Sequence, residues 1–493
     1  MGIVINQSIK NTVITYIGFV IGAANTLFMY PHFLGETYYG LTGYILSSAN
    51  VIMPLMAFGV HNTLVKFFSH YPTEKEKGQF LSFVLLLPFL FLIPMVLLGT
   101  LTYEYIAGFL SRENPIIHDF VWQIPVIGLC MGYFEIFYAW VKVHMQSVFG
   151  SFVKEVVLRV FITIFLFAVY FGWMSPLAFI NTLMGIYLAT TLVMFFYAMK
   201  VKKVSFSFQF PSNTKQVFTY SIFIILSGSI ANMLLDIDKN MIGQYIKIEN
   251  IAYYSVAIFI ATVISVPSRA MHQITYPITA KLMTEGKHDE LNELYKKTSI
   301  TLQIVGGLVF LGILLNINQL YLLLPENYRG GVFVVFTIGF SKYFDLILGN
   351  NNAIIFNSKY YRMVLFLGLL LAFMAITLNM LLIPKYGING AAIATLISIT
   401  FYSLAKLLFV VIKMKLFPFT MKTITSLVVF AVFFFAFYYW DFPFHPITNI
   451  VLKSTLITAL YVWVNYKLNI SEDFNSVVTT IIEKIRKAGM TKK

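Results

Sequence analysis

The chain has 493 residues, of which 58% are hydrophobic and 11% charged, and its mean hydropathy is +0.78. This composition excludes an ordinary soluble protein, whose surface needs far more charged side chains. The formal net charge of +14 does not indicate nucleic acid as a partner, because the lysines and arginines fall at the ends of apolar segments. A single cysteine, Cys130, excludes an intramolecular disulfide and a cysteine-based metal site.

Apolar windows of about 20 residues, long enough to cross about 30 Å of hydrocarbon, recur along the whole chain. They predict an all-α polytopic membrane protein with fourteen spans. The spans lie near 12–33, 38–60, 79–101, 119–141, 153–172, 176–198, 216–245, 251–273, 298–318, 332–354, 363–383, 389–412, 422–440 and 447–466. The first is too long for a signal-peptide core and is followed closely by the second, so we expect it to be retained.

The distribution of positive charge predicts the orientation of these spans. Lysines and arginines concentrate in the even-to-odd connections, and the opposite connections hold only Arg112, Lys247, Arg329 and Lys385. The positive-inside rule therefore places both termini in the cytoplasm. The basic tail, 471–493, is predicted to form an amphipathic helix with Ser471 as its N-cap, either on the inner leaflet or packed under the transmembrane helices.

Two pairs of similar segments indicate an internal repeat. FLGETYYGLTGYILSSANVIMPL (33–55) resembles YIKIENIAYYSVAIFIATVISVP (245–267) at an offset of about 212 residues. FGWMSPLAFINTLMGIYLATTL resembles IPKYGINGAAIATLISITFYSL at nearly the same offset. We therefore predict two six-helix lobes and a C-terminal extension, and in transporters the substrate pathway lies near the interface of such lobes. The predicted parts are the lobe 1–199, a basic linker 200–215, the lobe 216–415, two extra helices in 416–470 and the tail 471–493.

Three charged residues interrupt the seventh span, in MLLDIDKNMIGQY (233–245). Each charge costs about 2.5–3.5 kcal/mol at the bilayer centre on insertion scales. Asp236 and Lys239 are three residues apart and share a helix face, so an ion pair would offset much of this cost, whereas Asp238 points elsewhere. The three residues either line a substrate pathway or pair and hydrate at its outer mouth.

The tenth span carries a second polar set, in GFSKYFDLILGNNNAIIF (339–356). Lys342 and Asp345 are again three residues apart, either in the pathway or as a clamp between helices. Asn350, Asn351 and Asn352 cannot all face lipid, so at least one lines water or bonds to a neighbouring helix.

Other polar residues are placed by their position along the spans. Arg269, near Pro267 in the eighth span, suits paired phosphate oxygens, but snorkelling to the inner interface explains it equally well. Lys66 and His61 follow the second span and are predicted at the cytoplasmic entrance. Lys406 is predicted to snorkel.

The first lobe has fewer buried cations than the second, so we expect a charged binding surface to be asymmetric. Its polar residues include Glu135, Asn25, Asn50 and Asn181. We expect Arg159 to pair with Glu155, and we interpret Gly18 and Gly22 as a site of close helix packing.

These features together resemble the multidrug, oligosaccharidyl-lipid and polysaccharide (MOP) exporter superfamily, and within it the polysaccharide (Wzx-type) flippases. The segments that carry the resemblance are MAFGVHNTLVKFF (56–68), DKNMIGQYIKIENIAYYSVA (238–257), YPITAKLMTEGKHDELNELYKK (276–297) and LNMLLIPKYGINGAAIATLIS (378–398). The resemblance implies a V-shaped, two-lobed bundle that alternates between inward and outward openings. It also implies that an oligosaccharide linked to undecaprenyl pyrophosphate is moved to the outer leaflet of a bacterial inner membrane, with cavity cations meeting its head group. The implied partners are this substrate, membrane lipids and glycan-assembly proteins.

Two other function classes stay open. A cation-coupled multidrug exporter of the same superfamily would use Asp236, Asp238 or Asp345 as an H⁺ or Na⁺ site. A membrane glycosyltransferase or polymerase would use Asp236 and Asp238 as a DxD motif, but that motif needs a water-exposed site beside a nucleotide pocket. We expect no cofactor and no resident metal, because the eight histidines form no ligand-spaced cluster.

Overall fold

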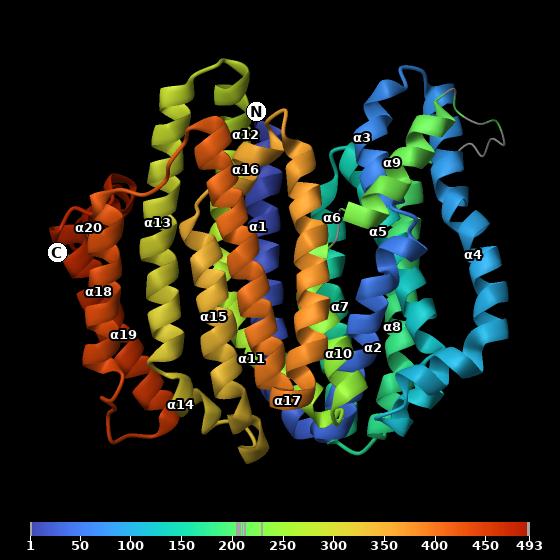
Figure 1. The fold of residues 1–493 in the computed structure, drawn as a ribbon, viewed down its shortest axis with the longest axis horizontal. Coiled ribbons are helices and arrows are strands. Elements are labelled where there is room, and N and C mark those ends of the chain that lie inside the picture. The colour runs from blue at the N-terminus through green and yellow to red at the C-terminus, as the bar shows by residue number, and fades with distance from the viewer. Residues whose placement is uncertain (1, 204–208, 210, 212, 228–229, 491–493) are drawn as a thin grey trace. The chain divides into compact units, whose positions relative to one another are not determined.

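The computed structural model describes residues 2–203, 209, 211, 213–227 and 230–490, and the regular structure in this part of the chain is helical (Figure 1). The helices form two compact units. Unit 1 comprises Met1–Val256 and Ala372–Ala391, and unit 2 comprises Ala257–Leu371 and Ala392–Lys493. Part of the predicted linker 200–215, namely residues 204–208, 210 and 212, lies outside the described residues. The predicted lobe boundaries remain predictions.

Unit 1 contains most of the helices of the first half of the chain. Its elements are α1 (Gly2–Ala23), the π-helix η1 (Ala24–Leu34), α2 (Gly35–Met56), α3 (Val60–Phe67), η2 (Phe68–His70), α4 (Glu74–Leu110), η3 (Pro115–Phe120), α5 (Gln123–Val143), α6 (Ser147–Phe152), the π-helix η4 (Val153–Val157), α7 (Leu158–Tyr170), α8 (Pro176–Val201), α9 (Thr214–Ser227), α10 (Ile230–Tyr245) and the first part of α11 (Glu249–Thr262).

Unit 2 contains most of the remaining helices. They are η5 (Val263–Ser265), α12 (Val266–Thr284), α13 (His288–Leu314), α14 (Ile317–Tyr321), η6 (Glu326–Gly331), α15 (Val332–Ile347), α16 (Asn351–Phe356), α17 (Tyr361–Phe409), η7 (Val410–Met414), α18 (Met421–Phe437), α19 (Pro446–Lys467) and α20 (Glu472–Met490). Residues 372–391 of α17 belong to unit 1.

Nine helical stretches in the described residues are long and apolar enough to cross a membrane. Two of them, Lys10–Met56 with 47 residues and Tyr361–Met414 with 54, are longer than one crossing needs. At 1.5 Å per residue they correspond to about 70 and 80 Å of helix, or about two crossings each. The other predicted spans also coincide with helices, including α7, α9 with α10, and the shorter apolar α18. The all-α polytopic fold is therefore confirmed.

The long helix α17 is broken by a glycine. Gly387 has φ 57° and ψ −136°, a conformation that glycine adopts without a Cβ penalty. A Cβ on the nearby Gly390 would lie 2.2 Å from the carbonyl oxygen of Leu382, so the chain also needs a glycine at that close approach. Figure 1 shows the chain reversing beside the label of α17, which separates the eleventh predicted span from the twelfth.

Within unit 1, the two segments identified as repeats pack on each other. Thr37 on α2 donates to Glu249 on α11 at 2.7 Å, and a Cβ built on Gly43 would lie 3.4 Å from the hydroxyl of Ser255. Both pairs are 212 residues apart, which is the offset of the predicted repeat. Equivalent segments that touch through equivalent positions are related by local two-fold packing. This contact supports the internal repeat.

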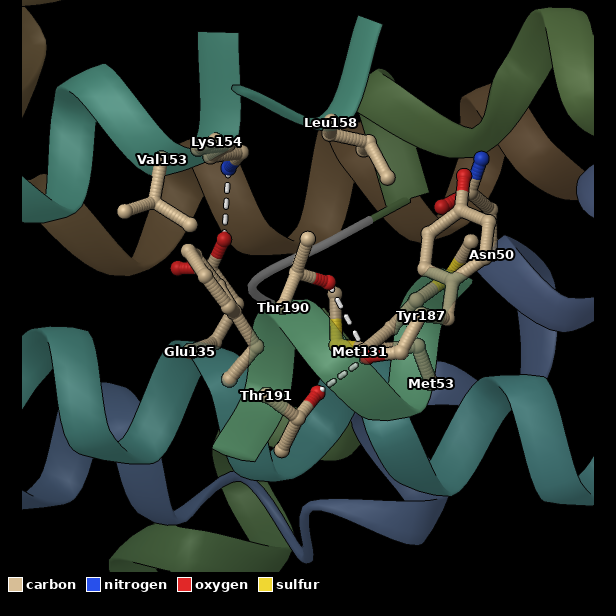
Figure 2. Close-up of a pocket in the computed structure, with 11 residues that line it drawn as sticks. Asn50, Met53, Met131, Glu135, Val153, Lys154, Leu158, Tyr187, Thr190 and Thr191 are labelled. Atoms are coloured by element: carbon tan, nitrogen blue, oxygen red, sulfur yellow. Dashed lines mark hydrogen bonds and ion pairs between the residues drawn. The ribbon is translucent and has the colours of Figure 1, made fainter. Parts of the chain in front are cut away.

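A cavity of about 170 Å³ lies inside unit 1 between α2, α5, η4, α7 and α8 (Figure 2). Glu135 from α5 and Lys154 from η4 lie together on one side of it, and Asn50 and Tyr187 lie on the other. The cavity therefore combines charged and polar groups within an apolar helical unit.

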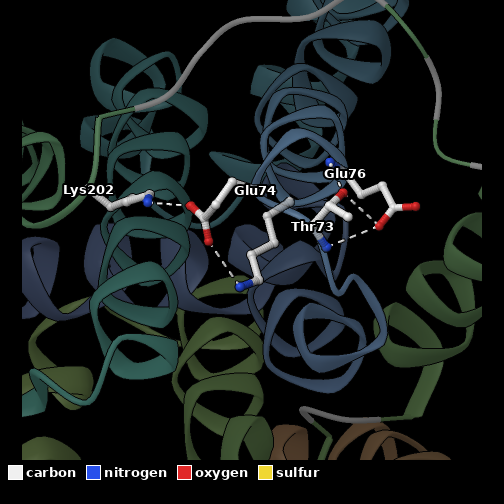
Figure 3. Close-up of polar contacts among 5 residues, drawn as sticks. Thr73, Glu74, Glu76 and Lys202 are labelled. Atoms are coloured by element: carbon white, nitrogen blue, oxygen red, sulfur yellow. Dashed lines mark hydrogen bonds and ion pairs between the residues drawn. The ribbon is translucent and has the colours of Figure 1, made fainter.

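Polar contacts fix the start of α4 in unit 1 (Figure 3). The hydroxyl of Thr73 accepts from the amide of Glu76, and the Glu76 carboxylate accepts from the amide of Thr73, both at 3.2 Å. The Glu74 carboxylate binds Lys77 at 3.1 Å and also binds Lys202, which directly follows α8. The beginning of α4 is thus held to the end of α8.

The predicted C-terminal helix is present as α20. The hydroxyl of Ser471 accepts from the amide of Phe474 at 3.3 Å, so the predicted N-cap is confirmed. Phe474 is buried against unit 2, whereas Val477, Ile481 and Ile482 are exposed. The first turn packs on the protein and the following turns leave an apolar stripe uncovered.

Candidate substrate-pathway charges

A connected group of charged and polar side chains in unit 2 is built around Asp345 on α15. Its Oδ1 accepts a hydrogen bond from Ser403 at 2.7 Å and from the ammonium of Lys406 at 3.0 Å. The Lys406 ammonium also donates to Asn352 at 3.1 Å and lies 4.3 Å from the ring centroid of Tyr402. The Asp345 side chain is 40% exposed, whereas that of Lys406 is 1% exposed. The cluster therefore offers its carboxylate to a ligand and encloses its ammonium.

The prediction that Lys406 snorkels is wrong. Snorkelling is favoured only when no partner within the protein can satisfy the ammonium, and here Asp345 and Asn352 do so. Lys342, three residues before Asp345, is partly buried and interacts electrostatically with the same carboxylate. Asp345 thus interacts with two cations, and its ion pair with Lys406 connects α15 to α17.

The three consecutive asparagines bind neighbouring helices. Asn350 donates to Thr279 on α12 at 2.8 Å, and Asn351 donates to Tyr295 on α13 at 2.7 Å. Both asparagines are almost completely buried. The third, Asn352, accepts the bond from Lys406 on α17. The prediction that at least one of them bonds to a neighbouring helix is confirmed.

Arg269 lies near the start of α12, just after the short 3₁₀-helix η5 and Pro267. Its side chain is exposed and forms no ion pair with any residue that the structure describes. One turn later, His272 interacts electrostatically with both Asp345 and Lys406. Arg269 is therefore open to an anionic ligand from the same helix that reaches the Asp345 cluster.

The charges of α10 in unit 1 separate as predicted. Lys239 lies 3.7 Å from Asp236, which confirms the pair three residues apart. Asp238 is completely buried and accepts from the Tyr254 hydroxyl at 2.6 Å and from the Asn379 amide at 2.7 Å. The two aspartates are held by different partners.

Among the described residues, no group of three or more His, Cys, Asp or Glu side chains is arranged to hold a metal ion.

The two predicted entrance residues lie on α3. Lys66 is exposed and its ammonium lies 3.7 Å from the ring centroid of Tyr220. His61 is partly buried, bonds to the side chain of Asn62 at 3.1 Å and interacts electrostatically with Glu135. His61 therefore interacts with a residue that lines the cavity of Figure 2, whereas Lys66 is not among the lining residues.

Two smaller predictions in unit 1 are confirmed. The guanidinium of Arg159 lies 3.0 Å from the carboxylate of Glu155. A Cβ on Gly18 would lie 2.4 Å from the carbonyl oxygen of Glu155, and one on Gly22 would lie 3.2 Å from the Arg159 side chain. The glycine pair therefore lets α1 approach this ion pair closely.

Sequence reasoning missed the partners that come from distant helices. Lys406 and Ser403 reach Asp345, Asn379 reaches Asp238, and Lys154 reaches Glu135 at 2.5 Å. The only signal in the sequence was the presence of polar residues within apolar spans, which marks intramembrane positions but does not pair them.

Comparisons with known proteins agree with this architecture. Among solved structures, the fold is similar to that of the lipid II flippase MurJ in an inward closed conformation, with a TM-score of 0.72 and 15% identity over 94% of this chain and 100% of that chain. It is also similar to an inward-facing multidrug resistance MATE family transporter of the MOP superfamily, with a TM-score of 0.60 and 10% identity over 81% of this chain and 94% of that chain. A search of curated protein sequences finds no match.

The fold is thus similar to that of these transporters, and together with the family match below it agrees with the predicted superfamily. A family model described as polysaccharide biosynthesis protein matches residues 8–283, more than half of the chain. The chain belongs to this polysaccharide biosynthesis protein family, and it is a multi-pass membrane protein.

Proposed function

We propose that the protein is a flippase that moves an oligosaccharide linked to undecaprenyl pyrophosphate across the bacterial inner membrane by alternating access. The family match supports a role in surface polysaccharide biosynthesis, and the fold shared with a lipid II flippase supports a lipid-linked substrate. The charge of the connections supports cytoplasmic termini. Reporter fusions at position 204, which lies outside the described residues, and at position 488 are expected to be cytoplasmic, and an external signal at either would contradict this topology.

The observation that carries the proposal is an open cation at the end of an apolar span. Glu249–Arg269 is apolar enough to cross the membrane, and its last residue presents an exposed guanidinium. A guanidinium binds phosphate oxygens in pairs, and the pyrophosphate is the charged part of the proposed substrate. Lys342 on α15 supplies the second pathway cation in this proposal.

Lys342→Met tests the proposal cleanly because Asp345 keeps its ion pair with Lys406. We expect Lys342→Met to abolish glycan export and Lys342→Arg to retain part of it, since only the second keeps a positive charge. Export is measured as surface glycan at matched membrane levels of each variant. Lys281→Met, a change at a lysine whose side chain is 73% exposed at the end of α12, is the control and should export normally. Normal export by Lys342→Met would contradict a pathway role for this residue.

A cation-coupled multidrug exporter remains the second candidate, and Asp238 is the observation that favours it. Its carboxylate is completely buried with the neutral donors Tyr254 and Asn379, and the Asn379 oxygen is buried without a hydrogen bond. Oxygen atoms gathered in this way suit H⁺ or Na⁺ as a coupling ion for either cargo. If the cargo is a drug, Asp238→Asn should raise cellular drug accumulation and leave surface glycan unchanged. A glycan defect without a drug phenotype would support the flippase.

We do not propose an enzyme. The solved structures that share the fold are transporters. The DxD-like pair Asp236 and Asp238 binds different partners, so the two carboxylates do not converge on one metal in this conformation. Incorporation of labelled sugar nucleotide by the purified protein would contradict this interpretation.

A further inference from the structure

The cavity in unit 1 contains a carboxylate and an ammonium side by side, and the pathway residues proposed above do not include them. The ammonium of Lys154 donates to Oε1 of Glu135 at 2.5 Å (Figure 2). The Glu135 side chain is 16% exposed and the Lys154 side chain is 47% exposed. Both residues line the cavity, so a ligand inside it would meet both charges.

This ion pair leaves hydrogen-bonding capacity open. Oε2 of Glu135 accepts no hydrogen bond from another described residue, and Lys154 uses one of its three ammonium donors on Oε1. On the opposite side of the cavity, the Asn50 amide and the Tyr187 hydroxyl form no side-chain hydrogen bond with described residues (Figure 2). Donors and acceptors thus face the same small space from two sides.

The balance of charge in the cavity selects against ionic ligands. Lys154 and Glu135 cancel within the lining, and Lys142 and His61 interact electrostatically with Glu135 from nearby. A cation or an anion would be attracted by one member of the pair and repelled by the other, so it would gain little to offset the cost of leaving water. A neutral polyol avoids both costs, because its hydroxyl groups donate to a carboxylate and accept from an ammonium at once.

The size and the apolar lining of the cavity fit the same ligand class. Its volume of about 170 Å³ suits a single ring rather than an extended chain. Phe134, Met131 and Leu158 cover part of the wall with apolar surface. A sugar ring presents hydroxyl groups at its rim and C–H groups on its faces, so it can use both kinds of surface.

We propose that this cavity binds one neutral sugar ring of the glycan cargo, with Glu135 accepting from and Lys154 donating to its hydroxyl groups. The inference rests on the proposed flippase function and deepens it, because it assigns recognition of the sugar to unit 1. The pyrophosphate is assigned separately to Arg269 and Lys342.

Binding measurements on the full-length protein in lipid nanodiscs test the proposal. One probe is the glycolipid that accumulates in cells lacking this protein, and the other is undecaprenyl pyrophosphate without sugar. We expect the wild-type protein to bind the glycolipid about tenfold more tightly, which corresponds to about one charge-assisted hydrogen bond. Glu135→Gln should remove this difference and leave the affinity for undecaprenyl pyrophosphate unchanged.

A charge-swapped variant separates sugar recognition from a purely structural ion pair. Glu135→Lys combined with Lys154→Glu keeps the pair but exchanges the positions of donor and acceptor. We expect it to fold and to bind undecaprenyl pyrophosphate while losing the preference for the glycolipid. The matched control swaps the exposed pair Glu326 and Arg329 on η6, which lies in unit 2, and should change neither affinity.

The outcomes distinguish failure of the sugar site from failure of the flippase function. Equal affinity of the wild-type protein for the two probes, or a full preference for the glycolipid in a folded charge-swapped variant, would overturn the sugar site and leave the flippase proposal intact. Failure of any glycolipid to accumulate in the deletion cells would overturn the flippase proposal itself.

Discussion

The two units contain ion pairs of opposite accessibility. In unit 1, Lys154 is 47% exposed and its partner Glu135 is 16% exposed. In unit 2, the carboxylate of Asp345 is 40% exposed and its partner Lys406 is 1% exposed. The first pair presents mainly its ammonium, and the second presents mainly its carboxylate.

This difference shows that the presence of a buried cation does not make it a binding group. Lys406 is enclosed by Asp345, Asn352 and the ring of Tyr402, so its ammonium interacts with groups of the protein itself. Cations that meet a ligand must instead remain accessible, as Arg269 and Lys154 do. The number of cations in the second lobe therefore does not by itself predict where a ligand binds, and the accessibility of each cation has to be considered.

Removal of the enclosed Lys406 ammonium should have the largest effect on stability. Lys406→Met should destabilise the protein by about 3–5 kcal/mol, because it leaves Asp345 without its ion-pair partner in a membrane-embedded site. The free energy of unfolding in mixed micelles measures this effect. Lys406→Met combined with Asp345→Leu should recover much of the loss, since both charges of the pair are then absent and only the interaction of Lys342 with this carboxylate is lost. A double variant as unstable as the single one would show that packing, not charge, is responsible.

Removal of the carboxylate's charge alone should have a smaller effect. Asp345→Asn keeps an oxygen acceptor near Lys406, and Asn352 still accepts from the ammonium. We expect a destabilisation of about 1.5–3 kcal/mol, the usual contribution of a hydrogen bond to a charged group. The same unfolding titration measures it, with Asp119→Asn on the exposed η3 as a control that should change little. A loss equal to that of Lys406→Met would mean that Asn352 does not help to hold the ammonium.

Much of the fold was predictable because membrane insertion depends on local composition. Each apolar run of about 20 residues must be helical in lipid to satisfy its backbone, so the segments predicted from hydropathy coincide with helices in the described residues. The repeat was predicted because both halves carry similar short polar turns before their spans, and the contact of Thr37 with Glu249 has the predicted offset. The π-helical segments η1 and η4 were not predicted, since π-helical turns have no clear composition signal.

The candidate sites were only partly predictable. Pairs three residues apart on one helix follow from helical geometry, which is why Asp236 and Lys239 were identified correctly. The partner of Asp345 lies 61 residues away on α17, and which helices are neighbours is decided by tertiary packing. Spacing therefore placed Lys342 with Asp345, either in the pathway or as a clamp between helices, while Lys406 was assigned to the lipid interface.

The exposed ammonium of unit 1 should be much less important for stability than the enclosed one of unit 2. Lys154→Met should destabilise the protein by about 1–2 kcal/mol. The Lys154 ammonium is half-exposed, so its ion pair with Glu135 contributes less than an enclosed pair does. Most of the cost comes from leaving the largely buried Glu135 carboxylate without a hydrogen-bond donor among the described residues. Unfolding titrations of Lys154→Met and Lys406→Met side by side measure the contrast. Equal losses would show that the different exposure of Lys154 and Lys406 does not determine how much each ion pair stabilises the protein.

The smallest expected effect comes from neutralising the carboxylate of the same pair. Glu135→Gln keeps an oxygen acceptor for Lys154, and the half-exposed ammonium can bind water in place of the lost charge. We therefore expect the free energy of unfolding to change by less than about 1 kcal/mol, whereas the preference for glycolipid should disappear. This separation of effects matters because a variant that lost both would show Glu135 to be a structural residue. Glu135→Asp, which keeps the charge but shortens the side chain, is the companion variant and should retain part of the glycolipid preference at similar stability.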